Sequence, residues 1–340
     1  MNRKLKKLIE KKGKLFEQTY EIIDGFLIKI YSDSEKGTMR NYFSQQMIIT
    51  KENAKGKKYV IYNISNDLSL EASFAVTERM KRLEKGYYNL HHFGSPIKFF
   101  IEDEEYYFQG NVKDCNIAIW TFFIKWLLTF EIGYSDLHLK GTGISHENKG
   151  ILFIGDKGAG KSSFIYELSK RKKVKMIANT HILIDNKLNM QGVYSKINFR
   201  ENMAQNIKND NLKMKNYIIN GCTNIDPDIL GYERIKECKI DKIVFYQYNE
   251  GGKCEIENID EEKMTTLIRT YAYGLNFYAL RTDLMDYCNR NVLEVSSKLM
   301  KDENVIKQLV HNTRCFIANI DVYNEKVWST VLSFLSNTGE

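Results

Sequence analysis

Short runs of apolar residues, separated by stretches with helical periodicity, divide the chain into two parts. In the first part, runs rich in β-branched and aromatic residues predict strands over residues 21–32, 58–64 and 97–109. A stretch with helical spacing, residues 70–83, lies between the second and third runs. We therefore expect residues 1–112 to form a smaller α+β domain at the N-terminus.

The pattern changes at about residue 113, where an almost continuous apolar stretch begins. Residues 115–130 predict a buried helix, because Lys125 interrupts the stretch and it is shorter than the ~20 residues that span a bilayer. Beyond it, apolar runs alternate with helical stretches, which is typical of an α/β sheet. The predicted strands are residues 151–154, 174–178, 241–248 and 315–320. We expect residues 113–340 to form one α/β domain, with the second of these strands parallel to the first.

The composition agrees with two globular domains. The chain has 340 residues, of which 43% are hydrophobic, and a formal net charge of +7. Basic residues concentrate in the first 14 positions, where their spacing favours an amphipathic surface helix. Because the sequence contains no recognisable nucleic-acid-binding module, we do not expect nucleic acid as a partner.

Cysteine and histidine positions give no metal site. The six cysteines are scattered, without the C-x-x-C spacing of a redox or zinc site. His91 and His92 are adjacent, so they cannot both face one site from a helix or strand, and we expect them in a loop. The N-terminus lacks the apolar core of a signal peptide. We therefore expect a cytoplasmic protein with reduced thiols and no transmembrane segment.

The recognisable chemistry centres on a G-x-x-x-x-G-K-[ST] sequence that begins at Gly155. An apolar strand precedes it and a helix-forming stretch follows it, which is the context of a phosphate-binding loop. Glycines let backbone N–H groups wrap an anion, Lys161 supplies charge for the β- and γ-phosphates, and Ser162 can bind Mg²⁺. The predicted nucleotide-binding residues are Gly155, Asp156, Lys157, Gly158, Ala159, Gly160, Lys161, Ser162 and Ser163. The sequence therefore predicts a nucleoside triphosphate site.

Two further segments are expected to reach the phosphates. His138 lies on a strand that precedes the loop strand, and a hairpin turn centred near His146 would place His138 opposite Ile154. His146 itself would then lie at the tip of the turn, without a role. The polar residues after the second strand are expected at the same edge of the sheet, where ligands gather. They are Asn179, Thr180 and His181.

Together these features resemble the HPr kinase/phosphorylase family and the related peptide-serine kinases of ribosomal-peptide (lasso-type) biosynthesis. The resemblance covers about residues 115–340 and rests on the loop Gly-Asp-x-Gly-x-Gly-Lys-Ser, the upstream histidine, and the final strand and helix. It implies a P-loop core in which helices flank a mixed sheet, and transfer of a phosphoryl group from ATP, with Mg²⁺, to a serine or threonine hydroxyl. It also implies a peptide or small-protein acceptor, a homo-oligomer, and a catalytic histidine, for which His138 is the matching position.

The sequence departs from that family after the second strand, where the family has two aspartates. Here the positions hold Asn179 and Thr180, and neither side chain can take a proton from a hydroxyl near neutral pH. The base would then be His138 or His181, because the pKa of neutral imidazole suits that role. With Lys161, these four residues make up the predicted catalytic set.

Two residues have alternative interpretations. Asp185 follows an apolar run, as a Walker B carboxylate for Mg²⁺ would, but the simpler interpretation, which the sequence favours, is an aspartate that opens a hairpin turn. Arg200 is compatible with a fork-shaped phosphate clamp or with a surface ion pair. Three functions therefore stay open: a kinase, a nucleotide-binding regulatory or scaffold protein with weakened catalysis, and a nucleoside triphosphate hydrolase that uses Asp185.

Overall fold

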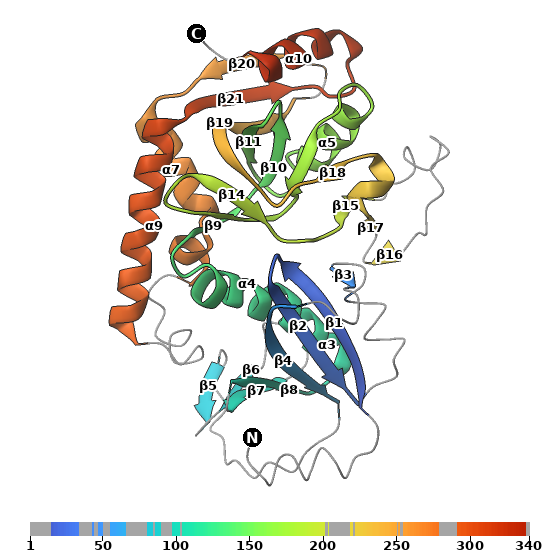
Figure 1. Cartoon of the computed structure of the whole chain (residues 1–340), viewed down its shortest axis with the longest axis vertical. Coiled ribbons are helices and arrows are strands. Elements are labelled where there is room, and N and C mark those ends of the chain that lie inside the picture. Colours follow the sequence, from blue (N-terminus) through green and yellow to red (C-terminus); the bar gives the residue numbers. More distant parts are fainter. Residues whose placement is uncertain are drawn as a thin grey trace. The chain divides into compact units, whose positions relative to one another are not determined.

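The computed structural model divides the chain into two compact units. Unit 1 comprises Met1–Ile132 and Leu280–Ser297, and unit 2 comprises Gly133–Ala279 and Lys298–Glu340 (Figure 1). The structure describes residues 15–33, 43, 47–49, 55–65, 80–83, 86–89, 97–102, 104–200, 203, 218–219, 222–249, 251, 254–278 and 291–337. The expected N-terminal helix and the pair His91 and His92 lie outside these residues.

Unit 1 contains a sheet in the order β3-β1-β2-β4-β8-β7-β6-β5. The strands are β1 (Phe16–Ile23), β2 (Phe26–Ser32), β3 (Ile48–Ile49), β4 (Lys57–Ile64), β5 (Met80–Leu83), β6 (Gly86–Asn89), β7 (Ile97–Glu102) and β8 (Glu105–Gln109). Residues 21–32, expected as one strand, belong to a hairpin, because Gly25 (φ +77°) turns the chain between β1 and β2. Residues 80–83, expected in a helix, form a strand that pairs with β6.

The aromatic helical segment belongs to unit 1. It runs through α3 (Val112–Ala118), η1 (Ile119–Phe123), α4 (Ile124–Trp126) and η2 (Leu127–Ile132). Its Phe123 ring packs against Phe99, Tyr106 and Phe108 of the sheet, with ring centroids 4.5–5.7 Å apart. Because these contacts bury the apolar face of the helix on the sheet, the units divide after Ile132 and not at the expected boundary after residue 112.

Unit 2 is an α/β structure built on a large mixed sheet in the order β18-β12-β10-β11-β19-β14-β13-β9. The strands are β9 (Leu137–Lys140), β10 (Thr142–His146), β11 (Lys149–Ile154), β12 (Lys175–Ala178), β13 (His181–Ile184), β14 (Asn189–Gly192), β18 (Glu233–Arg234) and β19 (Glu237–Tyr248). Strand β21 (Arg314–Ile320) also pairs with β19, and β20 (Glu255–Asn258) pairs with β21. Strands β11 and β12 run in the same direction, as expected, but β10 lies between them and β19 is the parallel neighbour of β11.

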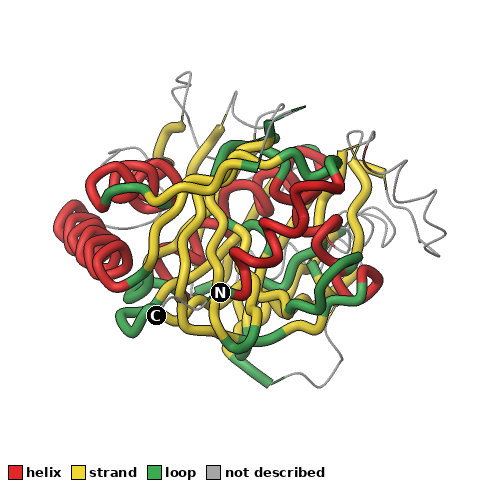
Figure 2. Tube along the Cα trace, turned by 90° about the horizontal axis from the view of Figure 1, so that it is seen from above, coloured by secondary structure: helices red, strands yellow, loops and turns green. Residues whose placement is uncertain are grey.

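Helices cover both faces of this sheet, which explains the continuous apolar runs of its strands. The helices are α5 (Lys161–Ser169), α7 (Glu261–Tyr271), η4 (Tyr273–Tyr278), α9 (Val292–Asn312) and α10 (Trp328–Ser336), with short 3₁₀ turns η3 (Pro227–Leu230) and η5 (Glu325–Val327). Phe153 packs into the core beneath α5 and α10, whereas Leu152 and Ile154 pack into the core beneath α7 and α9. The long helix α9 lies along one side of the strands (Figure 1 and Figure 2). Among the described residues, no helix combines the length and apolar character needed to cross a bilayer.

A small three-stranded sheet lies beside this core within unit 2. It contains β15 (Ile197–Arg200), β17 (Cys222–Ile225) and β16 (Ile218–Ile219) in that order. Phe199 of β15 is buried in the core beneath α5, where its ring meets that of Tyr166 at a centroid distance of 6.0 Å. This packing carries Arg200, the next residue, toward the start of α5.

Candidate functional site

The segment Gly155–Ser162, here called the glycine loop, connects β11 to α5. Gly155, Gly158 and Gly160 have φ angles of +149°, +99° and +88°, which residues with a Cβ rarely adopt. Gly160 is the N-cap of α5, so no side chain caps the first amides of that helix. The amide of Ala159 donates to the carbonyl of Asp156 (3.1 Å), which tightens the loop.

The glycine loop lies directly against the carboxyl end of β19. A Cβ on Gly155 would clash with the carbonyl oxygen of Tyr246, and a Cβ on Gly160 would lie 3.1 Å from the Cβ of Tyr248. The parallel ladder that pairs Ile154 with Phe245 brings these two backbones together. Only glycine permits this close approach, so the sheet determines where the loop lies.

This geometry makes the glycine loop suited to an anion. The amides at the start of a helix have no partners inside the helix, and the helix dipole places partial positive charge beside them. The three glycines carry no side chains, so at these positions the loop consists of backbone alone. Backbone N–H groups of this loop can therefore donate to phosphate oxygens, as at other helix N-termini.

Lys161 lies inside the glycine loop. Its Nζ donates to the carbonyl oxygens of Gly155 (2.6 Å) and Asp156 (2.9 Å). Burial and, to a smaller extent, the nearby ammonium of Lys140 lower the pKa of Lys161 to about 8, while the carboxylate of Asp156 opposes the shift. A bound anion would reverse this destabilisation of the ammonium form.

Arg200 lies against the other side of the loop. A Cβ on Gly158 would lie 2.9 Å from Nη2 of Arg200 and 3.4 Å from both its Cζ and Nη1, so the guanidinium lies directly against the loop at Gly158. Within the described part of the chain, Arg200 forms no ion pair with a carboxylate. The surface ion pair that the sequence left open is therefore absent there, and the guanidinium is available to an anion on the loop.

The end of α7 adds two residues that the sequence analysis did not single out, Tyr271 and Tyr273. An isolated bridge pairs Leu139 of β9 with Ala272, which lies between them. The hydroxyl of Tyr271 donates to Oδ1 of Asp156 (2.7 Å) in the glycine loop. No local pattern distinguishes Tyr271 or Tyr273 among the 21 tyrosines of the chain, because the bridge joins residues far apart in sequence.

Tyr273 covers a pair of histidines. The Nε2 of His138 lies 3.1 Å from the Nδ1 of His181, and both side chains are buried, with 0% and 2% exposure. The Tyr273 ring stacks on both, at centroid distances of 4.2 Å from His138 and 5.2 Å from His181. The structure thus brings together the two histidines proposed as bases, but in the interior of unit 2.

The expected position of His138 opposite Ile154 is wrong. His138 lies on β9, which pairs with β13 and places it opposite Leu183. Residue 141 is a glycine that separates β9 from β10, so only β10 forms the hairpin with β11. The turn of that hairpin is formed by Glu147 and Asn148, whose φ angles of +51° and +61° are those of a two-residue turn of the I′ type.

His146 is therefore not at the tip of a turn. It pairs with Lys149 at the end of the β10–β11 hairpin and is buried. Its Nε2 lies 3.4 Å from Oγ of Ser336 and 3.3 Å from the carboxylate of Glu147. Burial lowers the pKa of His146, which favours the neutral imidazole. His146 is a structural residue near the start of β11, at the opposite end of that strand from the glycine loop.

Asn179 and Thr180 follow β12 at the edge of the sheet where β11 also ends. Their carbonyl oxygens accept from the Thr142 hydroxyl and from the Gly141 amide, both at 3.1 Å. The side-chain Oδ1 of Asn179 is buried and has no hydrogen-bond partner among the described residues. Asn179 therefore offers an amide oxygen for a hydrogen bond at the carboxyl ends of β11 and β12, where the glycine loop begins. Neither Asn179 nor Thr180 supplies a carboxylate.

Asp185 lies away from the glycine loop. Its Oδ1 accepts from the amides of Lys187 (2.9 Å) and Asn189 (2.8 Å), and its Oδ2 accepts from the Asn189 side chain (3.1 Å). Asp185 directly follows β13, whereas His181 begins that strand, so the two residues are about 13 Å apart along the extended chain. The contacts thus fit the turn interpretation and not the proposed role as a metal ligand. In the described ranges, no group of three His, Cys, Asp or Glu side chains is placed to hold a metal ion.

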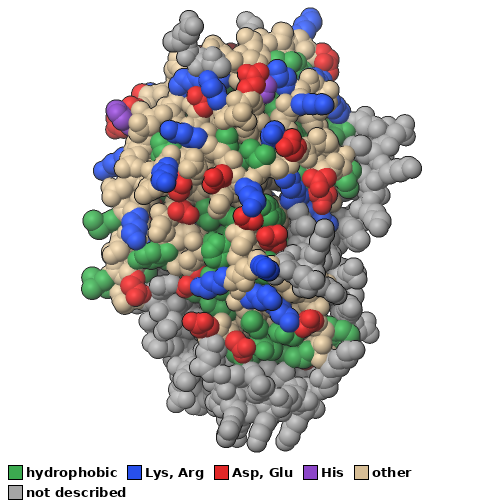
Figure 3. Space-filling view, viewed as in Figure 1, with side chains coloured by type: hydrophobic (Ala, Val, Ile, Leu, Met, Phe, Trp, Pro, Cys, Tyr) green, Lys and Arg blue, Asp and Glu red, His purple; other side chains and the backbone are tan. Residues whose placement is uncertain are grey.

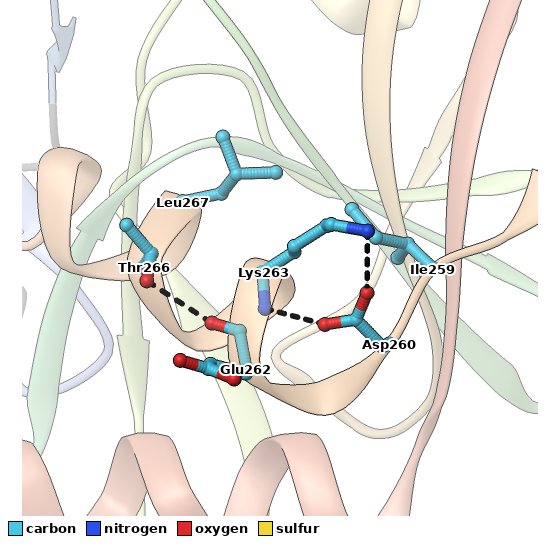
Figure 4. A pocket seen from close by; sticks show the side chains of 6 residues that line it. All are labelled: Ile259, Asp260, Glu262, Lys263, Thr266 and Leu267. Carbon is cyan, nitrogen blue, oxygen red and sulfur yellow. Dashed lines mark hydrogen bonds and ion pairs between the residues drawn. The ribbon is translucent and has the colours of Figure 1, made fainter.

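A surface pocket at the other end of α7 is a separate feature. It is lined by Ile259, Asp260, Glu262, Lys263, Thr266 and Leu267 (Figure 4). Asp260 caps α7 by accepting from the amide of Lys263 (2.8 Å), and its other oxygen pairs with the Lys263 ammonium (2.8 Å). Asp260 and Lys263 neutralise each other, and the remaining charge in the lining is the carboxylate of Glu262, so this pocket offers no cation for a phosphate. On the face shown in Figure 3, cationic and anionic side chains are interspersed.

The close approach between the glycine loop and β19 predicts a difference between two glycine substitutions. Gly155→Ala should lower the free energy of unfolding by about 2–4 kcal/mol, because it combines an unfavourable φ with a clash against the Tyr246 carbonyl. Gly231 also has a positive φ, +79° against +149° for Gly155, but open space surrounds a new Cβ there, so Gly231→Ala should cost only about 1 kcal/mol. Urea unfolding of both variants measures the difference. Equal costs would show that the loop does not depend on β19.

Comparison with known proteins gives no relative from which to transfer a function. No protein-family model matches the chain, and no curated protein matches it significantly. The function is therefore inferred from the glycine loop and the residues around it.

Proposed function

We propose that the protein binds a nucleoside triphosphate, with Mg²⁺, at the glycine loop. The observation that carries this proposal is the backbone of Gly155–Ser162, which three glycines with positive φ hold against β19 at the start of α5. Two cationic side chains, Lys161 and Arg200, lie on this backbone. Such a loop recognises the charge and shape of phosphate rather than a base or a sugar.

The residues at the loop fit a triphosphate and a magnesium ion. The amides at the start of α5 and the ammonium of Lys161 would hold the phosphates, and the hydroxyl of Ser162 would contact the metal. Mg²⁺ commonly keeps several waters and takes its other ligands from phosphate oxygens, so a site without a carboxylate cluster is compatible with it. When bound, the metal would neutralise charge on the phosphates.

The resemblance to HPr kinase favours ATP as the nucleotide and transfer of its terminal phosphoryl group to a serine or threonine hydroxyl as the reaction. The hydroxyl oxygen would bond to phosphorus, the diphosphate would leave, and a side chain of this protein would take the hydroxyl proton. His181 and His138 are the candidates for that proton, because Asn179 and Thr180 cannot accept it. Both imidazoles lie beneath Tyr273, so this role requires Tyr273 to move away from them.

The same burial favours a second candidate, a nucleotide-binding regulatory or scaffold protein. An imidazole with 0% exposure, as for His138, cannot reach an acceptor in this arrangement. Phosphate binding needs only the loop and its cations, whereas proton transfer needs an accessible base. The hydrolase that would use Asp185 has no such support, because that carboxylate is held in the β13–β14 turn.

A peptide or small-protein acceptor, a homo-oligomer and a cytoplasmic location stay predictions.

Nucleotide binding predicts stabilisation that depends on Lys161. Mg·ATP at about 100 times its Kd should add about 2.7 kcal/mol to the free energy of unfolding, and raise the Tm by roughly 5–10 °C. Lys161→Ala should remove most of this shift, whereas Lys170→Ala, at the other end of α5, should preserve it. Differential scanning fluorimetry measures all three. A wild-type Tm that does not change with Mg·ATP would contradict nucleotide binding.

The lowered pKa of Lys161 predicts that nucleotide affinity depends on pH. Phosphate binds the ammonium form, and with a pKa of about 8 in the free protein this form loses population between pH 7 and pH 9. Bound phosphate raises that pKa, so the affinity for Mg·ATP should fall about tenfold from pH 7 to pH 9. Lys161→Arg should bind more weakly but with a flatter profile, because its guanidinium stays charged. Titration calorimetry at both pH values measures this, and an equally steep profile in Lys161→Arg would assign the dependence to another group.

Label transfer separates the two candidate functions. Wild-type protein, Lys161→Ala and His181→Gln are incubated with labelled ATP, Mg²⁺ and serine-containing peptides, and nucleotide binding is measured in the same samples. A kinase labels the hydroxyl with the wild-type protein, and loses about 10²–10⁴ of this rate in His181→Gln while it still binds nucleotide. A regulatory protein binds nucleotide without labelling any peptide. Transfer that persists unchanged in His181→Gln would exclude His181 as the base.

A further inference from the structure

Lys140 is a cation beside the glycine loop for which the proposed function has no role so far. It is the last residue of β9, and its side chain is half-buried. Among the described residues, it forms no hydrogen bond or ion pair. Partial burial removes water from an ammonium group and so destabilises its charged form, and an anionic partner offsets this cost in free energy.

The strand pairings place Lys140 on the side of the loop where Asp156 lies. Lys140 pairs with His181 across the β9–β13 ladder. The bridge between Leu139 and Ala272 aligns β9 with the end of α7, so that Lys140 lies near Tyr271. The hydroxyl of Tyr271 in turn donates to Asp156 of the glycine loop. Lys140 therefore approaches the loop from the edge of the sheet, whereas Arg200 approaches it over Gly158.

The electrostatic interactions of Lys140 agree with this placement. Burial lowers its pKa, the ammonium of Lys157 lowers it further, and the carboxylate of Asp156 opposes the shift. Lys140 in turn lowers the pKa of Lys161. The directions of these shifts agree with ammonium groups of Lys140, Lys157 and Lys161 that lie near one another at the loop.

The formal charge at the glycine loop suits a ligand with several negative charges. The cations are Lys140, Lys157, Lys161 and Arg200, and the nearby carboxylate is Asp156, so the formal charge is four minus one, or +3. A monophosphate leaves part of this charge uncompensated, whereas a diphosphate or a triphosphate can neutralise it, so the position of Lys140 has to distinguish these two. Backbone amides and Lys161 suffice for the phosphate held inside the loop, and Lys140 lies beyond them toward the edge of the sheet.

We propose that Lys140 binds the terminal phosphate of the nucleotide and makes the site prefer a triphosphate to a diphosphate. This assignment rests on the proposed function and deepens it, since it names the part of the ligand that the site distinguishes. A diphosphate lacks the terminal phosphate that Lys140 would contact. The glycine loop and Lys161 should therefore bind a diphosphate with the same affinity whether or not the Lys140 ammonium is present. The loss of one charge-assisted hydrogen bond corresponds to roughly 10- to 100-fold in affinity.

Affinities for two nucleotides in four proteins test this assignment. Titration calorimetry measures Mg·ATP and Mg·ADP with wild-type protein, Lys140→Met, Lys140→Arg and Lys149→Met. Methionine keeps the apolar stem but removes the charge, arginine keeps the charge, and Lys149 is a half-buried lysine at the opposite end of β11. Lys140→Met should lose roughly 10- to 100-fold in affinity for ATP and less than about twofold for ADP. Lys140→Arg should keep most of the preference for ATP, and Lys149→Met should keep all of it.

The ratio of the two affinities keeps the outcomes distinct. A general loss of folding in Lys140→Met would weaken the binding of both nucleotides equally and would appear as a lower Tm of the free variant. In a variant with the wild-type Tm, an equal loss for ATP and ADP, like no loss at all, would overturn the role of Lys140. In either case the proposed function would stand, because the wild-type protein still binds nucleotide. If the wild-type protein binds neither nucleotide, the proposed function fails, and the assignment of Lys140 fails with it.

Discussion

The contact between the glycine loop and the carboxyl end of β19 is the constraint on which the candidate site depends. The parallel β11–β19 ladder brings Gly155 against the carbonyl of Tyr246, and only a residue without a Cβ fits there. Cores on both faces of the sheet hold these two strands in place. The loop is consequently presented by a rigid element, and its amides keep one orientation as α5 begins.

A short segment at the end of α7 joins the glycine loop to the buried histidines. Ala272 bridges to β9, Tyr271 holds Asp156 of the loop, and Tyr273 covers His138 and His181. Any displacement of this segment would therefore affect the anion site and the imidazoles together. This arrangement is a physical route by which occupation of the loop could expose a base, and it is compatible with a kinase and with a regulatory protein.

The sequence could predict the glycine loop, because its strand, glycines and helix are consecutive residues whose chemistry is local. It could not predict the surroundings, which depend on pairing between distant segments. A turn at Glu147 and Asn148 and a glycine at position 141 redirect β9 to β13, and this moves His138 from the loop to the interior. Tyr271 and Lys140 reach the loop through a bridge between residues more than a hundred positions apart. The mixed α/β character was predictable from alternating apolar runs, whereas the order of the strands was not.

A crystal structure of the protein with Mg²⁺ and a non-hydrolysable ATP analogue tests the central claim most directly. The account predicts phosphate oxygens within hydrogen-bond distance of the loop amides between Gly158 and Ser162. It also predicts that the Lys161 ammonium leaves the carbonyls of Gly155 and Asp156 for the phosphates. A nucleotide bound elsewhere in the protein, with Lys161 still donating to those two carbonyls, would contradict it.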